Sequence, residues 1–259
     1  RFLAKAHERG ADCVILDLED SVADTAKTAA REGLAAAVAQ VRQGPSQVAV
    51  RVNAGDGDDL HAAVRAGADL IVVPKCDTPG AIALVDAGLR ALGSEIPVLA
   101  LIESPGGVLA AADIARHPRL MGLATGSEDL ARSLGAEPLP EVLRIPKLLV
   151  HYAAKAAGKH SFGLLRSIAD YADLDGIADA ARQARAHGFD GATCVHPSAV
   201  AILNAAFAPS SQAVDWAQRV LAAATDGTGA AVVDGRMIDR PVIDRARHIL
   251  ARSGKPTGA

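Results

Sequence analysis

The sequence is short of cysteine, of long apolar runs and of excess charge of one sign, and each shortage excludes a class of protein. Its three cysteines (Cys13, Cys76 and Cys194) lie far apart with no Cys-x-x-Cys pair, so neither a zinc ribbon nor a disulfide scaffold is predicted. No apolar run approaches the roughly 20 residues that span a bilayer. A formal net charge of −3 leaves no basic field for nucleic acid or an anionic membrane.

The 259 residues are enough to bury a large core, so we expect one large domain or two small ones. The chain begins at Arg1 without an initiator methionine or a signal-peptide pattern, which predicts that it starts inside a longer protein. A reducing, cytoplasmic setting is the expectation, with no nucleic-acid or membrane partner.

Short apolar runs alternate with alanine-rich helical patterns, which is typical of a parallel sheet covered by helices. Strands are predicted at residues 13–17, 48–53, 70–74, 98–102, 121–125 and 192–195, with a weaker one at 161–165. Helices are predicted at residues 23–43, 60–66, 79–92, 107–116, 141–157, 177–187 and 211–224.

Seven strands in about 200 residues nearly make a (β/α)₈ TIM barrel. The chain opens on a helix-like segment, so we expect the first barrel strand to lie upstream of Arg1 or to be disordered. An open doubly wound sheet is the alternative, although no Gly-x-Gly-x-x-Gly follows the first strand. The predicted domains are a catalytic barrel over residues 1–224 and a helical C-terminal extension over 225–259. The extension carries an apolar stripe that we expect to pack on a neighbouring subunit.

Charged residues gather where the predicted strands end, which is where parallel α/β folds place their chemistry. A charged residue at one strand end is explained equally well by a helix cap and by function. Charged residues at six strand ends on one rim are much harder to explain as caps. The residues at these ends are Asp17, Glu19, Asp20, Arg51, Lys75, Glu103, Asp129 and His196.

Glu103 and Asp129 are the most specific pair at these strand ends. Two carboxylates without histidine or cysteine make a hard-oxygen site suited to Mg²⁺, with water and substrate completing the coordination. The structural alternative is that Asp129 caps a helix beginning at Leu130, while Glu103 pairs with Lys75 or Arg51.

Arg51 leaves an apolar strand, where a lone cation would be costly to bury. It is predicted to clamp a substrate carboxylate or carbonyl, or to pair internally with Asp17 or Glu19, and the two roles are compatible. Lys75 is predicted to bind substrate or to balance the acidic rim. His196, in a His-Pro turn, is as well explained by helix capping as by catalysis.

Taken together, these motifs resemble the citrate lyase beta-subunit-like (CitE-like) family of the HpcH/HpaI aldolase superfamily. The matching segments are Asp-Leu-Glu-Asp-Ser-Val (17–22), Arg-Val-Asn (51–53), Val-Pro-Lys (73–75), Leu-Ile-Glu-Ser (101–104), Gly-Ser-Glu-Asp-Leu (126–130), Val-His-Pro (195–197) and Asp-Gly-Arg-Met-Ile-Asp-Arg-Pro (234–241). They run in order through nearly the whole chain. The resemblance implies a (β/α)₈ barrel that assembles as a homotrimer or hexamer.

The implied activity is Mg²⁺-dependent cleavage or formation of carbon–carbon bonds in 3-hydroxyacyl-CoA thioesters such as malyl-, citramalyl- or citryl-CoA, with thioesterase activity as a further output. The resemblance makes Glu103 and Asp129 the Mg²⁺ ligands, with Arg51 and Glu103 touching substrate. Asp239 resembles a catalytic acid that reaches into a neighbouring subunit's site. Asp17, Glu19 and Asp20 resemble the residues that surround Arg51 and the metal-bound waters, and they are candidates for substrate binding.

Two departures from the family pattern bear on specificity. The usual opening strand is absent, and with it part of the thioester-carrier contact. The segment Ser167-Ile168-Ala169-Asp170 is also altered, which bears on the choice of acyl group.

Three alternative functions stay open at this point. One is the beta subunit of a citrate lyase complex that uses an acyl carrier protein thioester. Another is a class II pyruvate aldolase, although segment 17–20 lacks the histidine base of that class. A non-enzymatic assembly partner is disfavoured, because Arg51, Glu103, Asp129 and Asp239 are all present.

Overall fold

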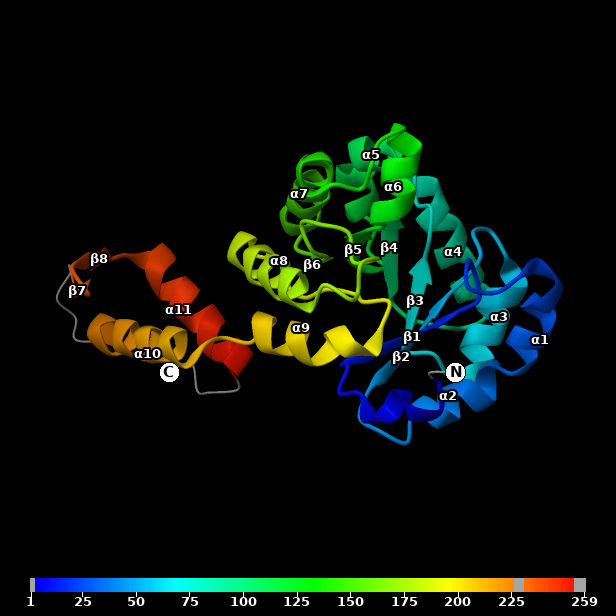
Figure 1. Cartoon of the computed structure of the whole chain (residues 1–259), viewed down its shortest axis with the longest axis horizontal. Coiled ribbons are helices and arrows are strands. Elements are labelled where there is room, and N and C mark those ends of the chain that lie inside the picture. Colours follow the sequence, from blue (N-terminus) through cyan, green and yellow to red (C-terminus); the bar gives the residue numbers. More distant parts are fainter. Residues whose placement is uncertain (1–2, 226–230, 254–259) are drawn as a thin grey trace. The chain divides into compact units, whose positions relative to one another are not determined.

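The computed structural model describes residues 3–225 and 231–253 and divides the chain into two compact units, Arg1–Asn204 and Ala205–Ala259 (Figure 1). The expected first barrel strand falls before the described residues. Within the described ranges, no helix is both long and apolar enough to cross a membrane.

A parallel six-stranded sheet forms the interior of the first unit (Figure 1). Its strands are β1 (Cys13–Asp17), β2 (Gln47–Arg51), β3 (Leu70–Val73), β4 (Val98–Ile102), β5 (Leu120–Thr125) and β6 (His160–Phe162). Every strand pairs with its neighbour in sequence, in the order β1-β2-β3-β4-β5-β6. A doubly wound sheet reverses its strand order at a switch point, whereas a barrel does not. The predicted barrel-like α/β class is therefore confirmed, with six paired strands among the described residues.

Helices follow the strands in alternation and contact one another in sequence, as on the outside of a barrel. The helices before the fourth strand are η1 (Leu3–Glu8), η2 (Asp24–Ala26), α1 (Lys27–Glu32), α2 (Leu34–Val41), α3 (Gly57–Ala66) and α4 (Pro79–Ala91). Those after it are α5 (Pro105–Ala115), α6 (Ser127–Leu134), α7 (Pro140–Ala156), α8 (Leu174–His187), η3 (Pro197–Ala199) and α9 (Val200–Phe207). The helix predicted at 23–43 is interrupted at Gly33, where α1 gives way to α2.

The two faces of the sheet carry different residues because side chains alternate along each strand. One face forms a small cluster around Ala49, Val72, Leu99 and Ala124, while the other packs into the main core with the helices. Asp17, Arg51 and Glu103 lie two or four residues beyond members or neighbours of the small cluster. The sheet therefore directs these three charged residues toward one common face at its carboxyl edge.

The strand predicted at 192–195 is wrong. These residues form no strand, and the chain pairs with β6 only through an isolated bridge between Phe162 and Gly191. A strand needs a continuous ladder with at least one neighbour, and beyond this single bridge residues 192–195 form no ladder with β6. The weaker prediction at 161–165 is confirmed in shortened form as β6.

The second unit consists of α10 (Ser211–Thr225), a hairpin of β7 (Ala231–Val233) and β8 (Arg236–Ile238), and α11 (Arg240–Ser253). The two helices share an apolar core of Val214, Ala217, Val220, Ala246 and Leu250. This packing places α10 in the same compact unit as α11, so the units divide at 204/205 rather than at the predicted 224/225. The predicted linking loop at 224–229 lies largely outside the described residues.

Candidate active site

Asp17 and Arg51 end the adjacent strands β1 and β2 and form a two-pronged ion pair. They are register partners, and Arg51 Nε and Nη2 donate to Asp17 Oδ1 and Oδ2 over 2.7 and 2.5 Å. Burial opposes ionisation, but hydrogen bonds from Arg51 and Ser21 lower the pKa of Asp17 to about 2. The pair stays ionised at neutral pH, so Asp17 fixes the plane of the guanidinium. The predicted internal pairing is thus present.

Glu19 lies between Arg51 and Lys75. Its buried carboxylate places Oε2 3.0 Å from Arg51 Nη1, and Oε1 forms an ion pair with Lys75 Nζ. Among the described residues Oε2 accepts no hydrogen bond of good geometry, so its contact with Arg51 is electrostatic and a lone pair remains unused. Asp20 lies 3.4 Å from Lys75 Nζ and 3.8 Å from Arg51 Nη1. These residues form one charged cluster.

Glu103 follows β4 and is buried, with 6% of its surface exposed. Its Oε2 accepts the backbone N–H of Lys75 over 2.6 Å, and Lys75 adopts a left-handed φ of 51° at this position. Burial, and then the charges of Asp129 and Glu19, raise the pKa of Glu103 to about 7. A bound cation would relieve this unfavourable crowding of carboxylates.

Asp129 lies in the first turn of α6 and is close enough for its charge to raise the pKa of Glu103. The helix begins at Ser127 after a Gly126 N-cap, so Asp129 is not the cap that the structural alternative required. Arg132 Nη2 donates to Asp129 Oδ1 over 2.7 Å. This arginine, one turn along the helix, neutralises the carboxylate from its solvent side.

Gly126 makes room for Glu103. A Cβ at position 126 would lie 2.6 Å from Glu103 Cγ and closer still to Oε1. The φ of Gly126 is −77°, so its backbone would suit any residue and only the space requires glycine. The turn before α6 is therefore shaped around the Glu103 carboxylate.

Gly126→Ala is expected to displace Glu103 and to weaken Mg²⁺ binding by about 10-fold or more, as changes to the supports of metal ligands do. Calorimetric titration of Mg²⁺ measures the effect, and thermal unfolding checks that the fold persists. Gly57→Ala is a matched control, because a Cβ there meets nothing within 4 Å. Unchanged Mg²⁺ affinity in Gly126→Ala would show that the position of Glu103 does not matter.

The residues present suit a divalent cation. Five carboxylates (Asp17, Glu19, Asp20, Glu103 and Asp129) and three cations (Arg51, Lys75 and Arg132) form this rim, which leaves a charge of −2 when all are ionised. The described residues hold no group of three or more metal-ligating side chains. Mg²⁺ commonly binds through only one or two carboxylates and keeps several waters, so a two-carboxylate site fits its chemistry.

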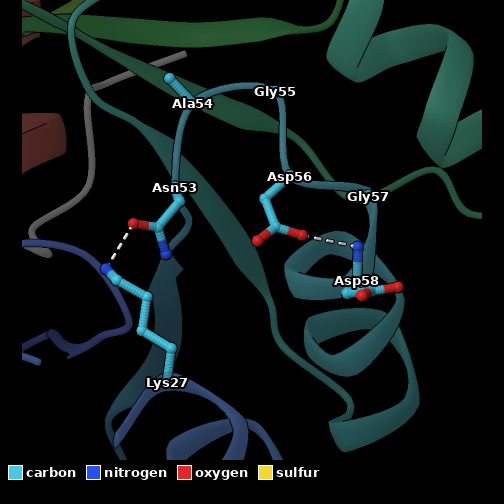
Figure 2. Close-up of a pocket in the computed structure, with 7 residues that line it drawn as sticks. All are labelled: Lys27, Asn53, Ala54, Gly55, Asp56, Gly57 and Asp58. Atoms are coloured by element: carbon cyan, nitrogen blue, oxygen red, sulfur yellow. Dashed lines mark hydrogen bonds between the residues drawn. The ribbon is translucent and has the colours of Figure 1, made fainter. Parts of the chain in front are cut away.

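Asn53, of the Arg-Val-Asn segment, supports the rim instead of lining it. It lines an open hollow of about 560 Å³, and Lys27 Nζ donates to Asn53 Oδ1 there over 2.6 Å. Figure 2 shows this contact. Lys27 also donates to the backbone oxygens of Leu18 and Glu19, so it holds the segment that carries Glu19. In the same hollow Asp56 accepts the Asp58 N–H and caps α3. The helix predicted at 60–66 therefore begins earlier, at Gly57.

Lys147 is a residue of this region that the sequence interpretation missed. It lies on α7 with 3% of its surface exposed, and its Nζ donates to Ser127 Oγ and to the backbone oxygens of Leu164 and Arg166. The available signal was its spacing, since Lys147 falls between Leu143 and Val150 in the buried stripe of an amphipathic helix.

Two further predicted residues have local roles in the structure. His196 Nδ1 accepts the Ser198 N–H at the start of η3, which is the capping role, and its ring stacks on Tyr171. In the second unit, Asp239 Oδ1 accepts the Val242 N–H over 3.2 Å at the start of α11. Neither capping hydrogen bond tests a catalytic role for His196 or Asp239.

Comparison with known proteins then identifies the family. A profile described as HpcH/HpaI aldolase/citrate lyase matches residues 1–197, which is most of the chain. The chain belongs to this family. The resemblance that the motifs carry is thereby confirmed, and with it the expectation of an enzyme of the aldolase and lyase class.

Relatives with similar sequences include malyl-CoA thioesterases and citrate lyase beta subunits. A (3S)-malyl-CoA thioesterase of Cereibacter sphaeroides is 36% identical over 98% of this chain and 90% of its own length. Citrate lyase subunit beta of Escherichia coli is 37% identical over 94% of this chain and 86% of its own length. Among solved structures, CitE of Mycobacterium tuberculosis in complex with magnesium, acetoacetate and coenzyme A has a TM-score of 0.77 and 31% identity. The match covers 98% of this chain and 96% of that one.

Proposed function

We propose that this protein is a Mg²⁺-dependent carbon–carbon lyase acting on 3-hydroxyacyl-CoA thioesters of the malyl, citramalyl or citryl type. The observation that carries the proposal is the closeness of Glu103 and Asp129 on the rim that Arg51 shares. The relatives named malyl-CoA thioesterase and citrate lyase support the substrate class. The CitE structure with magnesium and coenzyme A supports the metal and the thioester carrier.

Glu103 and Asp129 would hold the Mg²⁺, with water and substrate oxygens completing its coordination. When bound there, the ion would supply Lewis-acid stabilisation of negative charge on substrate oxygens. Glu19 and Asp17 keep the Arg51 guanidinium in one plane beside this site. Lys75 contributes its backbone N–H to Glu103 and its ammonium to Glu19.

In the cleavage reaction the 3-hydroxyl gives its proton to solvent water, the bond between C2 and C3 breaks, and C3 becomes the carbonyl carbon of the released oxo acid. The electron pair of that bond moves onto the thioester carbonyl, which becomes an enolate. Arg51 would donate an N–H to the developing enolate oxygen, and Asp239 would protonate the enolate carbon. Attack of water on the thioester carbonyl gives hydrolysis instead, so thioesterase activity is a second output of the same site.

A panel of malyl-, citramalyl-, citryl- and 3-hydroxy-3-methylglutaryl-CoA tests the substrate class. Lyase activity releases acetyl-CoA and an oxo acid or ketone fragment, whereas hydrolysis releases free coenzyme A, which a thiol reagent detects. We expect acetyl-CoA from at least one of the first three thioesters. Free thiol without acetyl-CoA would identify a thioesterase instead.

A second candidate function is the beta subunit of a citrate lyase complex, which the 37% identity to citrate lyase subunit beta favours. Such a subunit would act on a thioester of an acyl carrier protein. Comparison of kcat/KM for citryl-CoA and for the citryl carrier-protein thioester separates the two candidates. A strong preference for the carrier thioester would favour the subunit role.

The raised pKa of Glu103 predicts a pH-dependent Mg²⁺ affinity. Burial and the neighbouring carboxylates raise this pKa to about 7, and the ion requires the ionised carboxylate. The Kd is therefore expected to rise by about 10-fold for each pH unit below 7 and to level off above it. Asp17, with its pKa held at about 2, stays ionised throughout and does not contribute. Calorimetric titration across this range would contradict the assignment if the Kd stayed constant.

We further propose that the protein is a homo-oligomer, trimeric or hexameric, in which Asp239 completes a neighbouring subunit's site. The apolar stripe of α11 gives no independent support, because Ala246 and Leu250 are covered by α10 within the same unit. Support comes from the segment 234–241, which resembles the family's C-terminal motif, and from the separate compact unit that carries it.

Mixed variants test this arrangement. Asp239→Asn keeps the helix cap, since asparagine caps as well as aspartate, but removes the acid. Arg51→Ala removes the other half of the site. Each variant alone is expected to be inactive, and a mixture after subunit exchange is expected to regain about a quarter of wild-type activity at most. Exchange verified by mass spectrometry without any regain would place Asp239 outside the neighbouring site.

A further inference from the structure

The buried ammonium of Lys147 joins two loops at the carboxyl edge of the sheet. Its Nζ lies 2.7 Å from Ser127 Oγ, 2.8 Å from Leu164 O and 2.9 Å from Arg166 O. An ammonium group has three N–H donors, so these three acceptors use all of them. Burial lowers the pKa of Lys147, while the charge of Glu128 and the three oxygen acceptors favour the ammonium form.

The two loops that meet at Lys147 belong to different strand ends. Ser127 begins α6 and is two residues from Asp129, while Leu164 and Arg166 lie in the segment 163–173 that follows β6. A second link joins the same loops, because Ser167 Oγ donates to Glu128 Oε1. Segment 163–173 therefore lies against the turn that carries a proposed Mg²⁺ ligand.

Segment 163–173 has its own internal brace. Arg166 Nη1 donates to Asp173 Oδ2 over 2.6 Å, and Asp173 Oδ1 accepts the Gly176 N–H at the start of α8. These contacts fix the far end of the segment to α8. Its near end, at Leu164 and Arg166, is held by Lys147 through backbone oxygens that no side-chain substitution within the segment would remove.

We propose that Lys147 is the positioning residue that sets segment 163–173 against the metal-bearing turn 126–129, and that this segment forms the wall facing the substrate's acyl group. The proposal rests on the function proposed above. Loops that follow parallel strands build the substrate sites of barrel enzymes, and this segment follows the strand next to β5, which leads into Asp129. Lys147 itself does not touch the reacting atoms.

Lys147→Met tests the proposal, because methionine fills similar space without donating hydrogen bonds. The exchange removes a cation whose burial is unfavourable but leaves three oxygen acceptors without their donor, so thermal unfolding first checks that the variant folds. Amide hydrogen exchange within 163–173 is expected to accelerate by about 10-fold or more. Mg²⁺ affinity is expected to fall by about 10-fold, as it does when groups that support metal ligands are changed. The KM for the best thioester should rise more than kcat falls.

Lys155→Met is the matched control on the same helix. Lys155 is two turns along α7 and pairs with Asp190 over 2.6 Å, beside the amino end of β6. This variant is expected to lose a surface ion pair without altering exchange in 163–173, Mg²⁺ affinity or KM. Lys147→Arg keeps several N–H donors, so amide exchange within 163–173 should be slower in this variant than in Lys147→Met. Wild-type exchange in Lys147→Met, or the same acceleration in Lys155→Met, would overturn the proposal.

Ser127→Ala is a second variant that keeps the test decisive if Lys147→Met fails to fold. It removes one acceptor of Lys147 and is expected to accelerate exchange in 163–173 to a smaller extent; no change there would overturn the proposal. Hydrogen exchange is read on the metal-free protein without substrate. A wild-type chain that cleaves none of the thioesters would therefore contradict the proposed function, while the exchange result still decides the role of Lys147.

Discussion

Glu103→Gln is expected to abolish measurable Mg²⁺ binding while the protein still folds. The substitution keeps the size of the side chain and an oxygen for the Lys75 N–H, but it removes one of the two carboxylates of the proposed site. The folded-state pKa of Glu103 is raised from its ordinary value near 4.5 to about 7, so the free energy of unfolding of the metal-free protein falls as the pH rises between these values and stays lowered above 7. The metal-free variant should therefore be about 1–3 kcal/mol more stable than wild type at alkaline pH and about equal at acidic pH.

Calorimetric titration of Mg²⁺ and chemical unfolding in EDTA measure the two effects separately. Asp129→Asn should lose Mg²⁺ binding in the same way. Glu95→Gln is the matched control, since Glu95 is 88% exposed and pairs with Arg119 away from the rim. Retention of Mg²⁺ affinity in both Glu103→Gln and Asp129→Asn would mean that the ligands are wrongly assigned.

Arg51→Lys is expected to fold and to lose most activity, with kcat/KM reduced by about 100-fold to 1,000-fold, as for loss of an oxyanion donor. Lysine keeps the positive charge between Asp17 and Glu19 but lacks the planar fork that makes the two-pronged bond to Asp17. The ammonium would then be free to turn, and no donor would be held toward the substrate. Steady-state kinetics on the best thioester measure the loss.

Arg42→Lys supplies the comparison for Arg51→Lys. Arg42 is half-exposed and pairs with Asp69 just before β3, at the opposite end of the strands. Its conservative change is expected to leave kcat/KM within about 2-fold of wild type. Near wild-type activity in Arg51→Lys would reduce Arg51 to a structural role in the Asp17 and Glu19 cluster.

The carboxyl edge of the sheet was predictable because it follows from two local rules. Apolar runs bounded by glycine and proline located β1 to β5 to within two residues. Side chains alternate between the two faces along each strand, which directs Asp17, Arg51 and Glu103 to one face. The positions of the strands are therefore enough to predict that these residues, distant in sequence, lie near one another. The motif resemblance added the metal and the substrate class, which alternation alone does not specify.

The features that were missed depend on partners distant in sequence or on turn chemistry. The apolar residues at 192–195 suit a strand, but the segment forms no continuous ladder with β6 and only an isolated bridge precedes it, at Gly191. The hairpin of β7 and β8 was also missed, although Val-Val-Asp-Gly contains the Asp-Gly pair that is typical of a two-residue hairpin turn. In the structure Asp234 and Gly235 both have positive φ, as such a turn requires.

Lys147 was missed for a different reason. A lysine at a core position interrupts the apolar stripe of an amphipathic helix, and the sequence gives no reason for it. Only the arrangement of Ser127, Leu164 and Arg166 shows what Lys147 binds. These acceptors are a side chain and two backbone oxygens from separate loops. No spacing rule in the sequence brings them together.

The central claim is that this rim cleaves an acyl thioester only when Mg²⁺ is bound. The most direct test is acetyl-CoA release by the purified protein from whichever of malyl-, citramalyl- and citryl-CoA it cleaves best, first with Mg²⁺, then with excess EDTA, and then with Mg²⁺ restored. The account predicts turnover that EDTA abolishes and Mg²⁺ restores, with none in Glu103→Gln under any condition. Turnover that persists in EDTA, or that Glu103→Gln retains, would contradict it.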